Sequence, residues 1–176
     1  MPKWIYYVEG ECEQSFLKAF MYSKNNLFKP GKVEVYNFNN KKITKGFAYA
    51  VKSDTNFVIV IDTDKDDASV LDENIAMLLK HSCLKKSSIY IVLSIKNFED
   101  EILYACSKLN NIHEMFNTNS VSDFKKKFIK QQNLEAKLIG LGFDIYKMWS
   151  RKPEHPFEKF ENEGYKIKEK ISRKHV

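Results

Sequence analysis

Acidic residues follow two apolar runs of this chain at the point where each run ends. Residues 6–8 lead into Glu9, and residues 58–61 lead into Asp62, with Asp64 two positions further on. Buried strands of an open α/β sheet have this pattern, and ligands in such folds bind outside the carboxyl ends of the strands. Clustered carboxylates repel one another unless a cation lies between them. The pattern therefore predicts that these three acids share a divalent metal ion, Mg²⁺ or Mn²⁺.

The local spacing gives these acids different positions. Glu9 is expected to point into the crevice, because Gly10 permits a tight turn before the following helix. Asp62 and Asp64 project to the same side for as long as the strand geometry persists. A structural interpretation stands beside this one: Glu9 is then a helix-start acid favoured by the helix dipole, and the two aspartates are turn formers or N-caps.

A third polar group follows the apolar run at residues 88–93. Glu99 or Glu101 is expected to add a metal ligand or to position a water, and Lys96 lies where it could steady a phosphate. The structural alternatives are an exposed lysine at a strand end and a helix start, in which Asn97 and Asp100 form a variant of the capping box. We favour the functional interpretation for Glu99 and the structural one for Asp100.

The charge of the chain points to a polyanionic partner. The net charge is +6 over 176 residues, and the lysines are clustered. Lysine-rich faces of solvated helices are the alternative. Three scattered cysteines indicate neither a disulfide framework nor a zinc site, and the apolar runs are too short to cross a bilayer, so a cytoplasmic protein is expected. The candidate nucleic-acid contacts are Lys41, Lys42, Lys45, Lys125, Lys126 and Lys127, and a further basic stretch spans residues 166–174.

The order of the apolar patterns predicts the fold. Strands are expected at residues 4–8, 33–36, 57–61 and 88–93, and helices at 12–23, 41–53, 70–79 and 98–109. This alternation predicts an α/β fold, a mostly parallel four-stranded sheet with helices on both faces. Residues 1–116 form this domain, and residues 117–176 form a helical, basic C-terminal extension packed on it. The extension has helices at 121–130 and 134–141, followed by an aromatic piece at 143–149. Its Phe143, Tyr146 and Trp149 could stack on unpaired bases, but we assign them to the core.

The two acidic strand ends resemble the motifs of the TOPRIM domain family. Residues 8–11, Val-Glu-Gly-Glu, resemble its glutamate motif, and residues 61–64, Ile-Asp-Thr-Asp, resemble its Asp-x-Asp motif. The resemblance covers roughly residues 3–108 and is nearest to the small RloB-like proteins and the overcoming-lysogenization-defect nucleases. It implies that Glu9 acts in acid/base chemistry or metal binding and that Asp62 and Asp64 hold Mg²⁺. Asp66 matches the third acid of longer versions of the motif.

The chain departs from the family in three places. The glycine that often follows the aspartate motif is absent. The stretch around Glu99 resembles the Asn-Pro-x-Phe-Glu segment of RloB-like proteins but lacks its proline. The domain that carries the catalytic tyrosine of topoisomerases is also missing, so DNA strand passage is not expected.

The sequence therefore predicts a metal-dependent nuclease or phosphodiesterase that hydrolyses DNA or RNA, with phage defence as its setting. The alternative is a non-catalytic TOPRIM-fold module that binds nucleic acid or protein as the accessory subunit of a defence system, beside a partner ATPase. A nucleotide-binding phosphotransferase of flavodoxin-like topology is disfavoured, because the chain has no glycine-rich phosphate loop. No membrane partner is expected, and the oligomeric state stays open.

Overall fold

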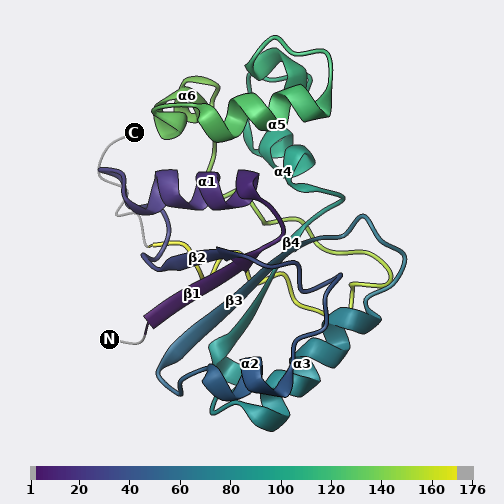
Figure 1. Cartoon of the computed structure of the whole chain (residues 1–176). Coiled ribbons are helices and arrows are strands. Elements are labelled where there is room, and N and C mark those ends of the chain that lie inside the picture. Colours follow the sequence, from purple (N-terminus) through teal and green to yellow (C-terminus); the bar gives the residue numbers. More distant parts are fainter. Residues whose placement is uncertain (1–2, 170–176) are drawn as a thin grey trace.

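The computed structural model describes residues 3–169 and contains one sheet with helices on either side (Figure 1). The first half of the described chain alternates strands and helices: β1 (Lys3–Val8), α1 (Glu11–Met21), β2 (Lys32–Val35), α2 (Lys45–Ala50), β3 (Thr55–Asp62) and α3 (Ser69–His81). The second half contains η1 (Lys86–Ser88), β4 (Ile89–Ser94), α4 (Phe98–Ala105), η2 (Ile112–Met115), α5 (Val121–Lys130) and α6 (Leu134–Gly140).

The four strands form an all-parallel sheet in the order β2-β1-β3-β4. This confirms the predicted α/β fold. The chain passes from β1 to β2 on one side and then returns to place β3 on the other side of β1. The carboxyl ends of β1 and β3 therefore flank the point where the strand order reverses, which is where open α/β sheets bind their ligands.

The two faces of the sheet bury different helices. Val58 and Val60 of β3 belong to the apolar cluster that includes α1, α4, α5 and α6. The alternating residues Phe57, Ile59 and Ile61 belong to the cluster that includes α2 and α3. Figure 1 shows these two helix groups on opposite sides of the sheet. Because side chains alternate along a strand, the residue after Ile61 is directed to the face covered by α1 and α4.

Two predicted helices are shorter in the structure. The helix predicted at 41–53 is confined to α2, because Thr44 caps its first turn by accepting a hydrogen bond from the Phe47 amide. The loop before it is fixed by Asn74, whose side-chain amide donates to the carbonyls of Phe38 and Lys41 at 2.8 Å each. The helix predicted at 98–109 ends at Ala105, and the next residue pairs with Phe143 as an isolated bridge.

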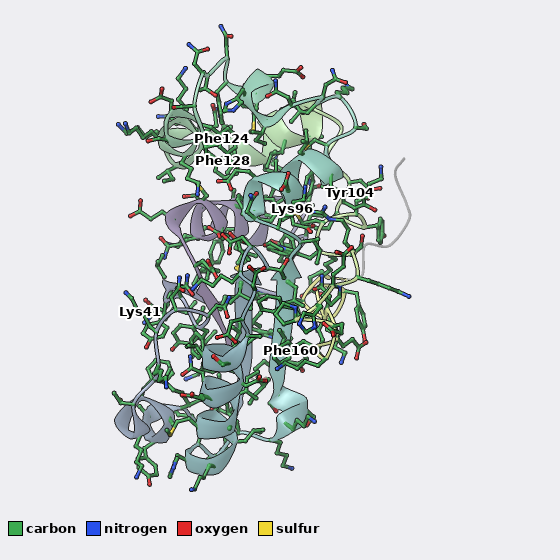
Figure 2. The ribbon with its side chains drawn as sticks, turned by 90° about the vertical axis from the view of Figure 1, so that its right-hand side faces the viewer. Lys41, Lys96, Tyr104, Phe124, Phe128 and Phe160 are labelled. Carbon is green, nitrogen blue, oxygen red and sulfur yellow. The ribbon has the colours of Figure 1, made fainter. Side chains whose placement is uncertain are left out.

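Residues after position 117 share a core with those before it. Phe124 and Phe128 of α5 (Figure 2) and Trp149 are buried in the same apolar cluster as Phe16 of α1. The C-terminal extension is thus packed on the sheet domain. Trp149 is a core residue as predicted, whereas Tyr146 of the same aromatic piece is exposed, so its assignment to the core was wrong. Within residues 141–169, however, the structure contains no helix, so the predicted helical extension is helical only as far as Gly140.

The irregular C-terminal run covers the free edge of β4. The amides of Ile91 and Leu93 donate to the side chains of Glu163, at 2.9 Å, and Asn162, at 3.0 Å. The Asn162 side chain also donates to the Leu93 carbonyl at 2.9 Å. These side chains occupy the positions of a fifth strand, which protects the sheet from pairing with other chains. The basic residues at 170–174 lie outside the described residues. Within residues 3–169, no helix is both long enough and apolar enough to cross a membrane.

Candidate active site

The structure brings Glu9 and Asp62 together. Glu9 directly follows β1, and Asp62 is the last residue of the neighbouring strand β3. The backbone amide of Asp62 donates to the Glu9 Oε1 atom at 3.2 Å. Two of the acids that the sequence assigns to metal binding therefore meet at the carboxyl edge of the sheet, at the point where the strand order reverses.

Helix α1 adds a carboxylate that the sequence interpretation missed. Glu13 lies in the first turn of α1 and is only 5% exposed. It shares the inward face of the helix with Phe16, Leu17 and Phe20, which are fully buried. An acid three or four residues before such an apolar stripe is the sequence signal that identifies it. Glu13 belongs to the site because it lines the same pocket as Glu9 and Asp62.

Helices α4 and α5 contribute an ion pair beside the site, formed by one acidic and one basic side chain. Glu99 of α4 is buried, and its Oε1 atom lies 3.2 Å from the Nζ atom of Lys125 of α5. Lys125 and Ile129 line a pocket of about 300 Å³ together with residues 9–13 and Asp62. Lys125, predicted as a nucleic-acid contact, thus faces the acidic pocket itself.

The carboxylates of the pocket are buried close to one another, and their pKa values are raised. Burial raises the pKa of Glu9 to about 7, although the Asp62 amide opposes the shift. Burial, followed by the charges of Glu13, Glu9 and Glu99, raises the pKa of Asp62 to about 9. The pKa of Glu13 is also raised, again mainly by burial. Removing carboxylates from water near one another favours their neutral forms, and a bound cation would reverse this preference.

One oxygen of the pocket has no partner. The Oδ1 atom of Asp62 is buried and makes no hydrogen bond to any residue in the described range 3–169. Leaving a buried polar atom unpaired costs about 1–3 kcal/mol, and more when the group is charged. A divalent cation beside this oxygen would remove that cost. The carboxylates of Glu9 and Asp62 fit Mg²⁺, which takes one or two carboxylates and keeps several waters.

The other predicted metal ligands lie further out. Asp64 and Asp66 are exposed, and neither lines the pocket. Asp64 is close enough for its charge to raise the pKa of Glu9 and of Asp62. Across residues 3–169, no three His, Cys, Asp or Glu side chains have the arrangement of a metal site. The predicted ligand set is therefore not preassembled in this conformation.

The predicted lysines fall into separate regions. Lys96 is exposed in the loop after β4, where its backbone amide donates to Thr63 Oγ1 at 2.9 Å, and it does not line the pocket. Figure 2 shows Lys96 and Lys41 well apart. Lys41, Lys42 and Lys45 lie in or just after the loop that follows β2 and are exposed, with Lys42 paired to Glu73. Lys126 and Lys127 are exposed on α5.

Comparison with protein family models, with curated proteins and with solved structures found no match for this chain. The resemblance to the TOPRIM family therefore stands on the two strand-end motifs and their order along the chain.

The raised pKa values predict a pH-dependent stability of the metal-free protein. Because the folded state holds protons on Asp62 and Glu9 that the unfolded state has released, the free energy of unfolding should fall as the pH rises from 5 to 8. The range ends at pH 8 because burial lowers the pKa of Lys168 to about 8. Above that pH the folded state releases a proton that the unfolded state keeps, so this group makes the free energy of unfolding rise with pH. Thermal unfolding in EDTA across this range measures the slope.

Asp62→Asn serves as the control for this slope. The substitution removes the titrating group with the larger pKa shift, so the variant should lose less stability between pH 5 and pH 8. Mg²⁺ should raise the melting temperature of the unsubstituted protein more at pH 8 than at pH 5. Equal slopes for the two proteins would contradict the assignment of the titration to the pocket.

Proposed function

We propose that this protein is a metal-dependent phosphodiesterase of TOPRIM type that hydrolyses nucleic acid. The observation that carries the proposal is the meeting of Glu9 and Asp62 at the β1/β3 switch point, where one buried oxygen of Asp62 has no hydrogen-bond partner. A cation bound beside these acids would favour their ionised forms, which burial disfavours. The basic character of the chain supports a polyanionic substrate.

Each pocket residue has a chemical role in this proposal. Asp62 and Glu9 would hold Mg²⁺ or Mn²⁺, with Asp64 and Asp66 as the outer acids that the family resemblance assigns. Bound there, the metal would polarise the phosphodiester and stabilise the charge of the transition state. Acid/base chemistry is the alternative role of Glu9, since burial raises its pKa to about 7 when no metal is bound beside it.

Lys125 and Glu99 act as a pair at the edge of the pocket. Lys125 is the positive group facing the acids, and burial of Glu99 beside it holds the ammonium in place. The lysine can therefore contact a phosphate oxygen that enters the pocket. The pKa of Lys125 is raised chiefly by Glu99, against the effect of burial, so the ammonium stays charged at neutral pH.

The exposed lysines of α5 extend this contact beyond the pocket. Lys41, Lys42 and Lys45 lie in the loop before α2 and at its first residue, and none of them lines the pocket. Lys126 and Lys127 flank Lys125 on α5. Contacts of this kind bind the phosphate backbone without reading sequence, and the affinity falls as salt rises.

The second candidate is a non-catalytic module that binds nucleic acid or protein beside a partner ATPase or another defence subunit. One observation favours it: within residues 3–169 the acids are not arranged as a ready metal site, and Asp64 is exposed. This module would use the same basic surface without hydrolysing its ligand.

A manganese titration together with a cleavage assay separates the two candidates. We expect calorimetry to detect Mn²⁺ binding, and labelled single-stranded and duplex DNA and RNA to be cut in Mg²⁺ or Mn²⁺ but not in EDTA. The absence of both a binding signal and hydrolysis would favour the accessory module. An excess of Mn²⁺ over the site is required, since side chains must rearrange to complete the ligand set.

A further inference from the structure

A shallow groove continues from the acidic pocket along helix α1. It has a volume of about 650 Å³ and lies between α1 and the connection from α5 to α6. Ile129 lines both this groove and the acidic pocket, so the two adjoin. Figure 1 shows α1 running alongside α5 and α6. A chain that enters the pocket can therefore continue into the groove.

The side chains of α1 that line the groove form one row. Ser15, Lys18 and Tyr22 are spaced three and four residues apart, which places them on the same side of the helix. The helix begins beside Glu9 and runs back from the carboxyl edge of the sheet. From Glu11 to Tyr22 it covers about 16 Å at 1.5 Å per residue. The row therefore leads away from the pocket over the length of a short oligonucleotide.

The ring of Tyr22 is exposed and held in one orientation, so a flat apolar ligand can stack on it. Its side chain is 69% exposed and lines the groove. The hydroxyl donates to the Gly31 carbonyl at 3.1 Å, which fixes the orientation of the ring. A held, exposed ring can stack on a base at little entropic cost.

The groove is polar and carries a cation. Lys18 is exposed and makes no ion pair with any residue in the described part of the chain. The opposite wall supplies the amides of Gln131 and Asn133. Glu135, the acid on that wall, is engaged, because its Oε1 atom accepts a hydrogen bond from the Asn25 side chain at 2.7 Å. An aromatic ring combined with a free lysine in a groove is the arrangement that binds unpaired nucleotides.

We propose that this groove binds single-stranded nucleic acid next to the scissile phosphate, with a base stacked on Tyr22 and a phosphate contacted by Lys18. The inference rests on the proposed function of the acidic pocket and names its substrate class. Stacking on a side-chain ring requires an unpaired base, so the groove selects single strands over duplexes.

The test measures binding of a fluorescently labelled oligothymidylate by anisotropy in EDTA, where no metal-dependent cleavage occurs. Tyr22→Ala should weaken binding about tenfold, because the stacked base loses its partner. Tyr22→Phe keeps the ring and should bind within about twofold of the unsubstituted protein. Lys18→Gln should weaken binding and lower the slope of log affinity against log salt by about 0.7, the value for one phosphate of a single strand.

Matched controls lie on the opposite face of the sheet. Tyr49 of α2 is 66% exposed, and Lys80 of α3 is also exposed. Tyr49→Ala and Lys80→Gln should leave the affinity unchanged. Equal losses for Tyr22→Ala and Tyr49→Ala would overturn the proposal. The proposal would also be overturned if Tyr22→Ala lost as much affinity for duplex DNA as for single-stranded DNA. Displacement of the oligonucleotide by polyglutamate at the same concentration of charge would overturn it as well.

The outcomes also separate this inference from the proposed function. Tyr22-dependent binding without cleavage in Mg²⁺ would support the groove and contradict the phosphodiesterase. Cleavage in Mg²⁺ with unchanged binding by Tyr22→Ala would support the phosphodiesterase and overturn the groove.

Discussion

Replacing Asp62 by Asn should lower the Mg²⁺-dependent cleavage rate about a thousandfold or more. A metal supplies several kcal/mol of transition-state stabilisation, and each 1.36 kcal/mol corresponds to a factor of ten in rate. Asn keeps the shape of the side chain but removes the charge at the centre of the acidic pocket. Affinity for an oligonucleotide in EDTA should stay within about threefold, since the phosphate backbone is bound mainly by lysines. Single-turnover cleavage and anisotropy measure the two quantities.

Asp54→Asn is the matched control for this substitution. Asp54 is exposed and directly precedes β3, so it lies at the opposite end of the same strand. The Asp54→Asn variant should cleave and bind nucleic acid as the unsubstituted protein does. Asp62→Asn should melt at the same temperature or higher at pH 8, because the substitution removes an acid whose charged form is disfavoured by burial and whose Oδ1 atom has no hydrogen-bond partner. A folded Asp62→Asn variant with undiminished cleavage would remove the metal assignment.

The convergence of Glu9 and Asp62 could be predicted because it follows from local patterns and one rule of topology. Each acid ends an apolar run, and the carboxyl ends of parallel strands share one edge of the sheet. The sequence does not state that β1 and β3 are neighbours. The continuous apolar character of residues 57–61 predicts a central position for β3, but residues 89–93 share this character and form the edge strand β4. The hydrogen bond between the Asp62 amide and Glu9 adds the geometry.

Glu13 and Lys125 show which parts of the site the sequence does not reveal. Glu13 resembles any acid in a first helical turn, where the helix dipole favours it, and only packing against α4 and α5 buries it. Lys125 is more than a hundred positions from Glu9. Its helix is amphipathic, but this pattern does not indicate which other helix it packs against. Which helix packs on which is decided by the shape of the whole core and not by periodicity.

The predicted helix at 41–53 was too long for a related reason. Its basic residues and apolar spacing continue through positions 41–44, but the side chain of Asn74 binds the backbone there at Phe38, Lys41 and Ile43. These hydrogen bonds come from α3, and tertiary contacts of this kind override local helix propensity. The same holds at the end of α4, where a bridge to Phe143 replaces the last turn.

Glu99 and Glu101 stand two positions apart on α4 and have different environments. Glu99 is paired with Lys125, which lines the pocket, and its functional role stays a prediction. Glu101 is fully buried and accepts hydrogen bonds from the amides of Ile95, at 2.9 Å, and Trp149, at 3.0 Å. Because residues two apart point to different sides of a helix, one acid contacts α5 and the other contacts the C-terminal run.

Glu101 holds that run in place through Arg151. The Arg151 Nε atom donates to Glu101 Oε1 at 3.0 Å, and its Nη2 atom donates to the Ile95 carbonyl at 2.9 Å and lies 2.8 Å from the same Glu101 oxygen. Glu101→Ala would leave the guanidinium and two backbone amides without their acceptor. Breaking a buried ion pair on one side costs about 3–5 kcal/mol. We therefore expect the melting temperature to fall by about 6–20 °C, at about 2–4 °C per kcal/mol for a chain of this size.

Two further variants make this stability measurement specific. Glu101→Gln keeps one acceptor oxygen but leaves the arginine charge unpaired, so its melting temperature should lie between those of the unsubstituted protein and Glu101→Ala. Glu158→Ala removes an exposed acid that pairs with His155 and should change the free energy of unfolding by less than about 0.5 kcal/mol. If Glu101→Ala were as stable as Glu158→Ala, the C-terminal run would be held by its other contacts, such as those of Asn162 and Glu163 with the edge of β4.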